Sequence, residues 1–184
     1  EFRRVLFRSG PIKAAPKDGD TSIYPISFLA YGDMGISNSW NTAVLTSKMI
    51  ASGEASFIVH AGDISYADNR AKINNGTIYE GVLNDFYNEV MNSSSLAPYM
   101  TSSGNHEEIL DFEAYKMRVG LTLPKGMVTG ASEFWYSWNH GPIHFLAFDQ
   151  DQPWSVGSPQ YEFIIADLAA VDRTLTPWVI AYNH

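Results

Sequence analysis

Short apolar runs alternate with amphipathic segments along most of the chain. A short apolar run that ends at polar turn residues is typical of a buried strand, and apolar positions spaced three or four apart are typical of a helix. The pattern predicts strands at Ile26–Tyr31, Phe57–Ala61, Ala97–Thr101 and Trp178–Tyr182. It predicts helices at Trp40–Ser52, Ile78–Met91 and Gln160–Val171.

Two further apolar runs predict a hairpin. Phe134–Trp138 and Ile143–Phe148 flank a turn signal with the sequence Asn-His-Gly-Pro at residues 139–142. The alternation of strands and helices elsewhere predicts an α/β domain with a partly parallel sheet, to which the hairpin adds antiparallel strands. We therefore expect mixed β-sheets flanked by helices.

The two ends of the chain differ from this pattern. Residues 1–9 (EFRRVLFRS) resemble the translation of a sequencing-library adapter, so we exclude them from the prediction of the fold. Residues 10–25 are rich in Pro, Lys, Asp and Gly and suit a linker. Residues 26–184 form the predicted domain, and they end on an apolar run closing with His184. A chain rarely stops directly after a buried strand, so we interpret the sequence as an internal piece of a longer protein.

Composition and charge narrow the classes of function. The 184 residues contain 12 Lys and Arg against 20 Asp and Glu, a formal net charge of −8. Residues 1–9 hold three arginines and one glutamate, so the remainder carries −10. This charge disfavours nucleic acid or an anionic membrane as a partner. No apolar run is long enough to span a bilayer, and the lack of cysteine excludes disulfides and thiolate metal sites.

Polar side chains that can bind metals follow four of the predicted strands. In chain order they are Asp33, Asp63 with Tyr66, Asn105-His106-Glu107, and His184. Because sites in open α/β sheets form at the carboxyl ends of strands, we expect these four ends to meet at one edge. Oxygen and nitrogen donors without sulfur suit iron, manganese and zinc, and a carboxylate can bridge two such ions.

Each of these residues also has an ordinary structural explanation. A Gly-Asp pair after a strand is usually a turn or a helix N-cap, and a lone tyrosine such as Tyr66 usually packs. His60 and His144, inside predicted strands, suit hydrogen-bonded positions in the core or near the site, and His140 suits a surface turn. The series of motifs as a whole is far more specific than any one member.

The series resembles that of the purple acid phosphatases, which belong to the calcineurin-like metallophosphoesterases. The resemblance covers about residues 13–184. It rests on the segments Tyr-Gly-Asp-Met-Gly (31–35), Gly-Asp-Ile-Ser-Tyr-Ala-Asp (62–68), Gly-Asn-His-Glu (104–107), 134–149, 159–161 and 177–184. Other metallophosphoesterases have a histidine ligand two residues after the first aspartate. Gly35 stands there in this chain and Tyr66 is present instead, which is the purple acid phosphatase pattern.

The resemblance implies a fold and a set of metal ligands. The fold would be a metallophosphoesterase-like αββα sandwich. Asp33 and Tyr66 would bind Fe(III), and Asp63 would bridge it to a divalent zinc, manganese or iron ion. Asn105 and His184 would bind that divalent ion. The family also needs a downstream Gly-His-x-His motif, which lies beyond His184.

The resemblance further implies two residues that act beside the metals. His106 would face the phosphate and the leaving-group oxygen as the catalytic residue, and Glu107 would orient His106. The implied activity is that of an acid phosphatase acting on small phosphate monoesters. The motifs leave open a diesterase, a nucleotide or phytate phosphatase, or an inactive piece that lacks the last histidine ligands.

Two sequence triplets bear on the location of the protein. Asn75-Gly76-Thr77 and Asn92-Ser93-Ser94 match the pattern of glycosylation acceptors. The family resemblance implies a secreted, lysosomal or vacuolar protein. It also implies an upstream fibronectin-like domain, and residues 10–25 would be the C-terminal end of that domain. Neither the pattern nor the resemblance indicates an oligomeric state.

Overall fold

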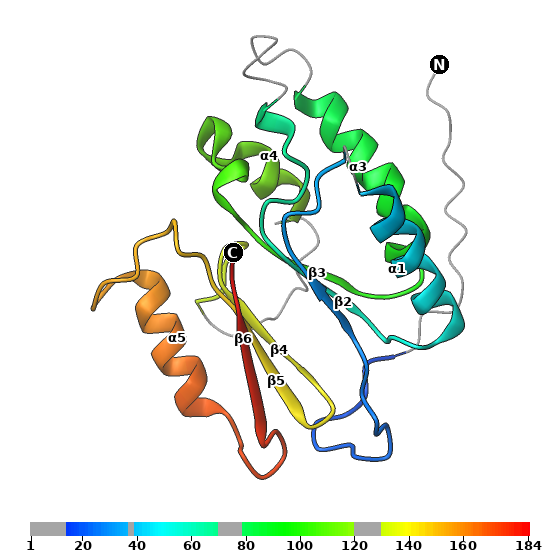
Figure 1. The fold of residues 1–184 in the computed structure, drawn as a ribbon. Helices are drawn as coiled ribbons and strands as arrows, with labels where there is room; N and C mark the ends of the chain where they lie inside the picture. The colour runs from blue at the N-terminus through cyan, green and yellow to red at the C-terminus, as the bar shows by residue number, and fades with distance from the viewer. Residues whose placement is uncertain (1–13, 37–38, 70–78, 120–129) are drawn as a thin grey trace.

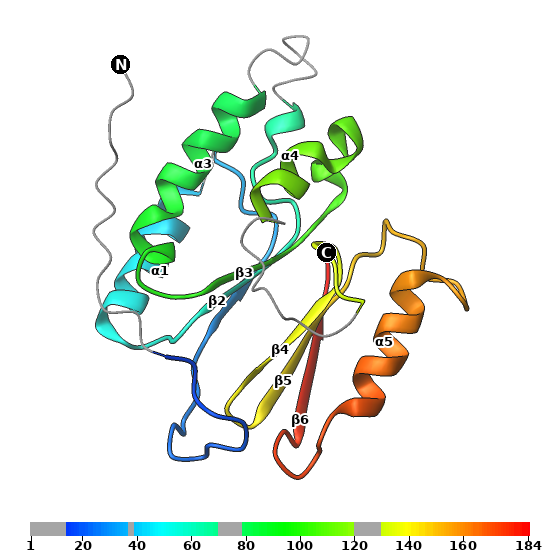
Figure 2. The ribbon, with the colours of Figure 1, turned by 180° about the vertical axis from the view of Figure 1, so that it is seen from behind.

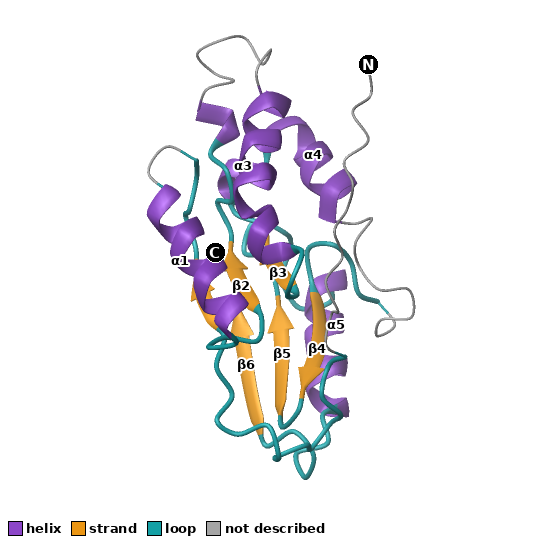
Figure 3. Cartoon of the chain, turned by 90° about the vertical axis from the view of Figure 1, so that its right-hand side faces the viewer, coloured by secondary structure: helices purple, strands orange, loops and turns teal. Residues whose placement is uncertain are grey.

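The strands form two three-stranded sheets, which lie face to face between helices (Figure 1). The computed structural model describes residues 14–36, 39–69, 79–119 and 130–184. The helices α1 and α3 lie on one side of the pair of sheets and α5 lies on the other, as the reverse and side views also show (Figures 2 and 3). This arrangement confirms the expected αββα sandwich. Residues 1–9 and the acceptor Asn75-Gly76-Thr77 lie outside the described residues.

The first sheet is parallel throughout. Its strands are β1 (Leu29–Tyr31), β2 (Ile58–Ala61) and β3 (Tyr99–Ser102), in that order across the sheet. The crossovers contain α1 (Trp40–Ser52) and α3 (Tyr79–Ser94), both predicted from their apolar spacing. Gly53 ends α1 in the left-handed conformation at φ 77°, the usual way for a glycine to close a helix.

The second sheet is mixed. β4 (Tyr136–His140) and β5 (Ile143–Ala147) form the predicted antiparallel hairpin, and β6 (Trp178–Tyr182) pairs in parallel with β5. The connecting helix α5 (Pro159–Ala170) starts after Ser158, whose hydroxyl accepts a hydrogen bond from the Tyr161 N–H at 3.3 Å. Serine at the N-cap followed by proline is a strong helix start signal.

The main apolar core lies between the two sheets. Residues of both sheets meet there, and the buried members are Phe57, Val59, Tyr136, Ile143, Phe145, Ala147 and Tyr182. Phe57 and Phe145 are fully buried, with their rings packed edge to face at 5.4 Å between centroids. Each such side chain contributes roughly 1.5–3 kcal/mol by leaving water. This core holds the two sheets face to face.

A helical segment after β3 was not predicted. It comprises the 3₁₀ turn η1 (Asn105–Glu107) and α4 (Ile109–Val119), in which Leu110, Asp111 and Phe112 have positive φ of 52–58°. Non-glycine residues rarely adopt this left-handed conformation, so local sequence signals do not predict it. Burial of Phe112, Tyr115 and Val119 against α3 stabilises the segment.

The described part of the expected linker packs against the second sheet. The Gly19 N–H donates to the Gly141 carbonyl at 3.0 Å, and the Asn139 amide donates to Asp18 at 2.9 Å. Residues 14–25 therefore contact the β4–β5 turn, although their assignment to an upstream domain stays a prediction. Across the described ranges, no helix combines the length and apolar character needed to cross a bilayer.

Candidate metal centre

The expected site residues come from both sheets. Asp33 and Asp63 each lie two residues after a strand of the first sheet, and Asn105 opens η1 after β3. His184 lies two residues after β6, which belongs to the second sheet. The expectation of four strand ends along one sheet edge was therefore wrong. The ends of the two sheets converge because the sandwich core holds them face to face.

Two glycines allow these ends to approach one another. A Cβ atom on Gly62 would lie 2.4 Å from the Cβ of His184, and one on Gly104 would lie 2.4 Å from Asp63 Oδ1. Neither position can accept a side chain without moving a site residue. Asp33, Asp63 and Tyr66 also have positive φ, of 54°, 49° and 54°. Among the described non-glycine residues, positive φ occurs at these three positions and at three positions of α4, and strained backbone of this kind is common at functional sites.

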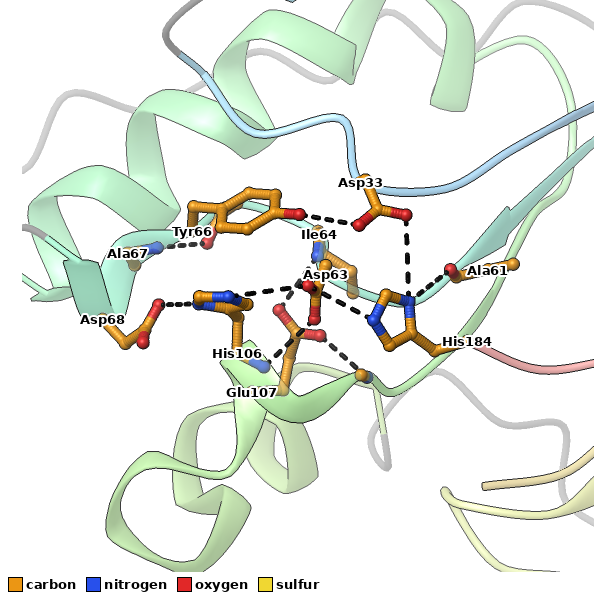
Figure 4. Close-up of polar contacts among 12 residues, drawn as sticks. Asp33, Ala61, Asp63, Ile64, Tyr66, Ala67, Asp68, His106, Glu107 and His184 are labelled. Carbon is orange, nitrogen blue, oxygen red and sulfur yellow. Dashed lines mark hydrogen bonds and ion pairs between the residues drawn. The ribbon is translucent and has the colours of Figure 1, made fainter. Parts of the chain in front are cut away.

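Three potential ligands lie within reach of a single ion. Ligand atoms of Asp33, Asp63 and His184 all lie within 4.8 Å of one another. His184 Nε2 is 3.3 Å from Asp63 Oδ2, and its Nδ1 is 3.9 Å from Asp33 Oδ2 (Figure 4). The Tyr66 hydroxyl donates to Asp33 Oδ1 at 2.7 Å, which places the phenol at the same site.

The donor set fits hard cations. The Asp63 side chain is only 4% exposed, and in the described part of the chain its ion-pair partners are the imidazoles of His106 and His184. Within the same part, no lysine or arginine pairs with Asp33 or Asp63. A buried carboxylate without a cationic side chain is costly unless a proton or a metal ion compensates it. Carboxylate, phenol and imidazole donors suit iron, zinc or manganese.

Tyr66 is protonated when no cation is present. Burial raises the pKa of the Tyr66 phenol, and the hydrogen bond to Asp33 and the charge of Asp63 raise it further. The phenol therefore keeps its proton, which it donates to Asp33 in a hydrogen bond, unless a cation displaces that proton. Metal binding at this tyrosine must release a proton.

His106 lies on the other side of Asp63. Its backbone N–H donates to Asp63 Oδ1 at 3.0 Å, and its ring Nε2 is 3.7 Å from Asp63 Oδ2. The ring Nδ1 is 2.7 Å from Asp68 Oδ1, and the Tyr66 ring packs on the imidazole at 4.3 Å between centroids (Figure 4). The exposed Asn105 immediately precedes it and lies between Gly104 and His106, which both contact Asp63.

Glu107 does not orient His106 as expected. Its buried carboxylate accepts hydrogen bonds from the backbone N–H groups of Ile64 at 2.9 Å and Gly104 at 3.0 Å. Burial raises its pKa to about 7, although these bonds act in the opposite direction. The carboxylate that is hydrogen-bonded to the His106 ring is that of Asp68, the last residue of the motif at 62–68, for which the sequence predicts no role. Glu107 instead ties the loop after β2 to the loop after β3.

The remaining histidines lie outside this cluster. His60 is fully buried in β2, where its Nδ1 is 2.9 Å from the Tyr99 hydroxyl. His144 lies under α5, with Nε2 2.8 Å from Asp167. His140 is not a plain surface residue, because its ring packs on Phe57 at 4.6 Å between centroids and is partly buried. The expectation of core positions for His60 and His144 is confirmed.

Comparisons with known proteins agree with this architecture. The family model described as calcineurin-like phosphoesterase matches residues 26–184, and the chain belongs to that family. Purple acid phosphatase 15 of Arabidopsis thaliana is 31% identical over 99% of this chain and 37% of its own length. The probable inactive purple acid phosphatase 27 of the same plant is also 31% identical, over 98% of this chain and 31% of its own length.

A solved structure shows the same fold. A purple acid phosphatase from yellow lupin seeds superposes with a TM-score of 0.71 at 30% identity, covering 94% of this chain and 32% of the lupin chain. The chain thus spans about a third of the length of these relatives. The resemblance to purple acid phosphatases is confirmed.

Proposed function

We propose that the full-length protein is an acid phosphatase that hydrolyses phosphate monoesters with a binuclear Fe(III)–M(II) centre. The observation that carries the proposal is the convergence of Asp33, Asp63 and His184 within 4.8 Å, with Tyr66 hydrogen-bonded to Asp33. Asp33 and Tyr66 would hold the ferric ion, Asp63 would bridge, and Asn105 and His184 would hold the divalent ion. Two such ions supply Lewis-acid activation of the ester and of the attacking water.

The protein's own contribution is proton transfer by His106. Because the Asp68 carboxylate accepts at Nδ1, that nitrogen carries a proton and the ring is held with Nε2 toward the site. In its cationic form the ring donates from Nε2 to the oxygen that leaves phosphorus. Asp68 then stabilises the positive charge on the imidazole before transfer. Tyr66 limits the motion of the ring by packing on it.

A groove that is lined by Asn183, the residue before His184, favours simple monoesters over highly charged substrates. It has a volume of about 510 Å³ and is lined by Asn183, Asp149, Asp151 and Trp154, among other residues. The exposed carboxylate of Asp151 faces it, the Asp149 carboxylate is buried in its wall, and none of its described lining residues is a lysine or arginine. A leaving group that carries further phosphates would be repelled there. We therefore favour a monoester with an uncharged leaving group over nucleotides or phytate.

A substrate panel tests this function. The metal-loaded full-length protein should hydrolyse p-nitrophenyl phosphate with kcat/KM at least about tenfold above that for bis-p-nitrophenyl phosphate, ATP and phytate, or ~1.4 kcal/mol in transition-state stabilisation. Chelation should abolish turnover, and adding iron and zinc back should restore it. A preference for the diester, ATP or phytate would contradict the assignment to phosphate monoesters. Absence of turnover with all four substrates would support the alternative that the protein is inactive.

We also propose that the protein is secreted, and the position of a glycosylation acceptor supports this. Asn92 of the second acceptor triplet is exposed near the end of α3, where an attached glycan would meet solvent. A mass shift at Asn92 on treatment with an N-glycosidase would support it.

A further inference from the structure

A buried carboxylate joins the loops that carry two of the expected ligands. Asp149 follows β5 and is 1% exposed. Its Oδ2 accepts from the Ser103 hydroxyl at 2.5 Å, and its Oδ1 accepts from the Asp151 N–H at 2.8 Å. Ser103 is fully buried and stands two residues before Asn105.

The backbone of Asp149 is fixed from a third direction. Its N–H donates to Gln160 Oε1 at 2.8 Å, and the Gln160 amide donates back to its carbonyl at 2.9 Å. Gln160 is fully buried in the first turn of α5. The preceding Phe148 N–H donates to the Tyr182 carbonyl at 3.2 Å, two residues before His184. Asp149 therefore cannot move without moving either α5 or the end of β6.

The chain after Ser103 has little freedom of its own. Gly104 packs so closely on Asp63 and His184 that a Cβ there would lie 2.4 Å and 3.0 Å from their side chains. A shift of the Ser103 backbone would therefore displace Asn105 relative to His184. The hydrogen bond to Asp149 sets that backbone position from the second sheet, whereas Glu107 braces it from the first.

We propose that Asp149 is a positioning residue, which holds the Asn105 loop in register with His184 through the Ser103 hydroxyl. The inference rests on the proposed function, in which Asn105 and His184 share the divalent ion. Asp149 contacts neither Asp33 nor Tyr66 in the described residues. Its loss should therefore weaken binding of the divalent ion and leave binding of the ferric ion unchanged.

Zinc affinity measured by chelator competition tests this role in the full-length protein loaded with iron. Asp149→Ala and Ser103→Ala should each lower zinc affinity about tenfold, the lower end of what outer-shell partners of a metal site contribute. The double variant should lose about tenfold as well, because both changes remove the same hydrogen bond. Asp149→Asn keeps an acceptor oxygen for Ser103 and should retain most of the affinity. The visible absorption that depends on Tyr66 should be unchanged.

Asp167→Ala is the matched control. Asp167 is also a buried carboxylate that accepts from a serine hydroxyl, that of Ser137, but it belongs to α5 and contacts His144. Its loss should lower the melting temperature without changing zinc affinity. Wild-type zinc affinity in Asp149→Ala and Ser103→Ala, or a hundredfold loss in the double variant, would overturn the positioning role alone. Absence of zinc binding in the wild type would contradict both this role and the proposed function.

Discussion

His106 shows how the fold pairs residues that are not neighbours in sequence. The family resemblance implied that Glu107 orients it. In a 3₁₀ turn, however, successive side chains point about 120° apart. Glu107 therefore faces the backbone of Ile64, and the carboxylate at the His106 ring comes from Asp68 after β2. The sequence predicts which residue types the site contains, but the pairing depends on a turn that it does not signal.

Replacement of Asp68 by asparagine tests this pairing. The amide keeps the volume of the carboxylate but cannot stabilise a cationic imidazole, so kcat should fall about 10–100-fold. Metal content should match that of the wild type, because Asp68 contacts the ring of His106, which is not a proposed metal ligand. Steady-state kinetics and elemental analysis on the same sample measure both quantities. Glu107→Gln serves as the comparison, and an equal fall in kcat there without loss of metal would contradict the assignment of Asp68.

At the scale of single elements, β2 is packed on both of its faces, against the second sheet on one and against helices on the other. Val59 faces the core between the sheets, while Ile58 packs under α1 and His60 contacts Phe86 of α3. The Tyr31 hydroxyl donates to the Tyr99 hydroxyl, which leaves the Tyr99 proton for His60 Nδ1. His60 is therefore neutral, and burial lowers its pKa to about 3.

The stability of the protein should depend on pH through His60. Between about pH 6.5 and pH 3 the histidine of the unfolded chain binds a proton that folded His60 does not, so stability falls as the pH falls. From pH 7.5 to pH 5 this lowers the free energy of unfolding by about 2 kcal/mol. His60→Gln should reduce the loss by that amount in denaturant titrations. His140→Gln should reduce it much less, because His140 is only half-buried. Equal pH dependence in wild type and His60→Gln would contradict the neutral state of His60.

The elements differ in how far local sequence predicts them. The bounds of α1 agree with prediction because Gly53 gives an unambiguous end, and α5 starts at the Ser158-Pro159 signal. β1 begins at Leu29 rather than Ile26, since only its last residues pair with β2. α4 escaped prediction because Leu110–Phe112 adopt a left-handed conformation that tertiary packing imposes. Local signals therefore predict elements with capping residues, and fail where packing overrides them.

At the scale of the whole molecule, the site depends on the contact between the two sheets. The sequence identified Asp33, Asp63, Asn105 and His184 from their places after strands, and the structure brings Asp33, Asp63 and His184 together. The sequence did not predict that His184 approaches from the second sheet, because strand order is set by long-range packing of residues such as Phe57 and Phe145. The buried link from Ser103 to Asp149 also joins segments distant in sequence and carries no local signal.

The most direct test of the account is the metal content and colour of the full-length protein, with Tyr66→Phe beside it. The account predicts about two metal ions per chain and a visible tyrosinate-to-iron absorption that Tyr66→Phe removes. Tyr24→Phe, which changes an exposed tyrosine, should leave both unchanged. A protein that binds no metal, or that keeps its colour and metal content in Tyr66→Phe, would contradict the claim that these strand ends hold an iron-containing pair of cations.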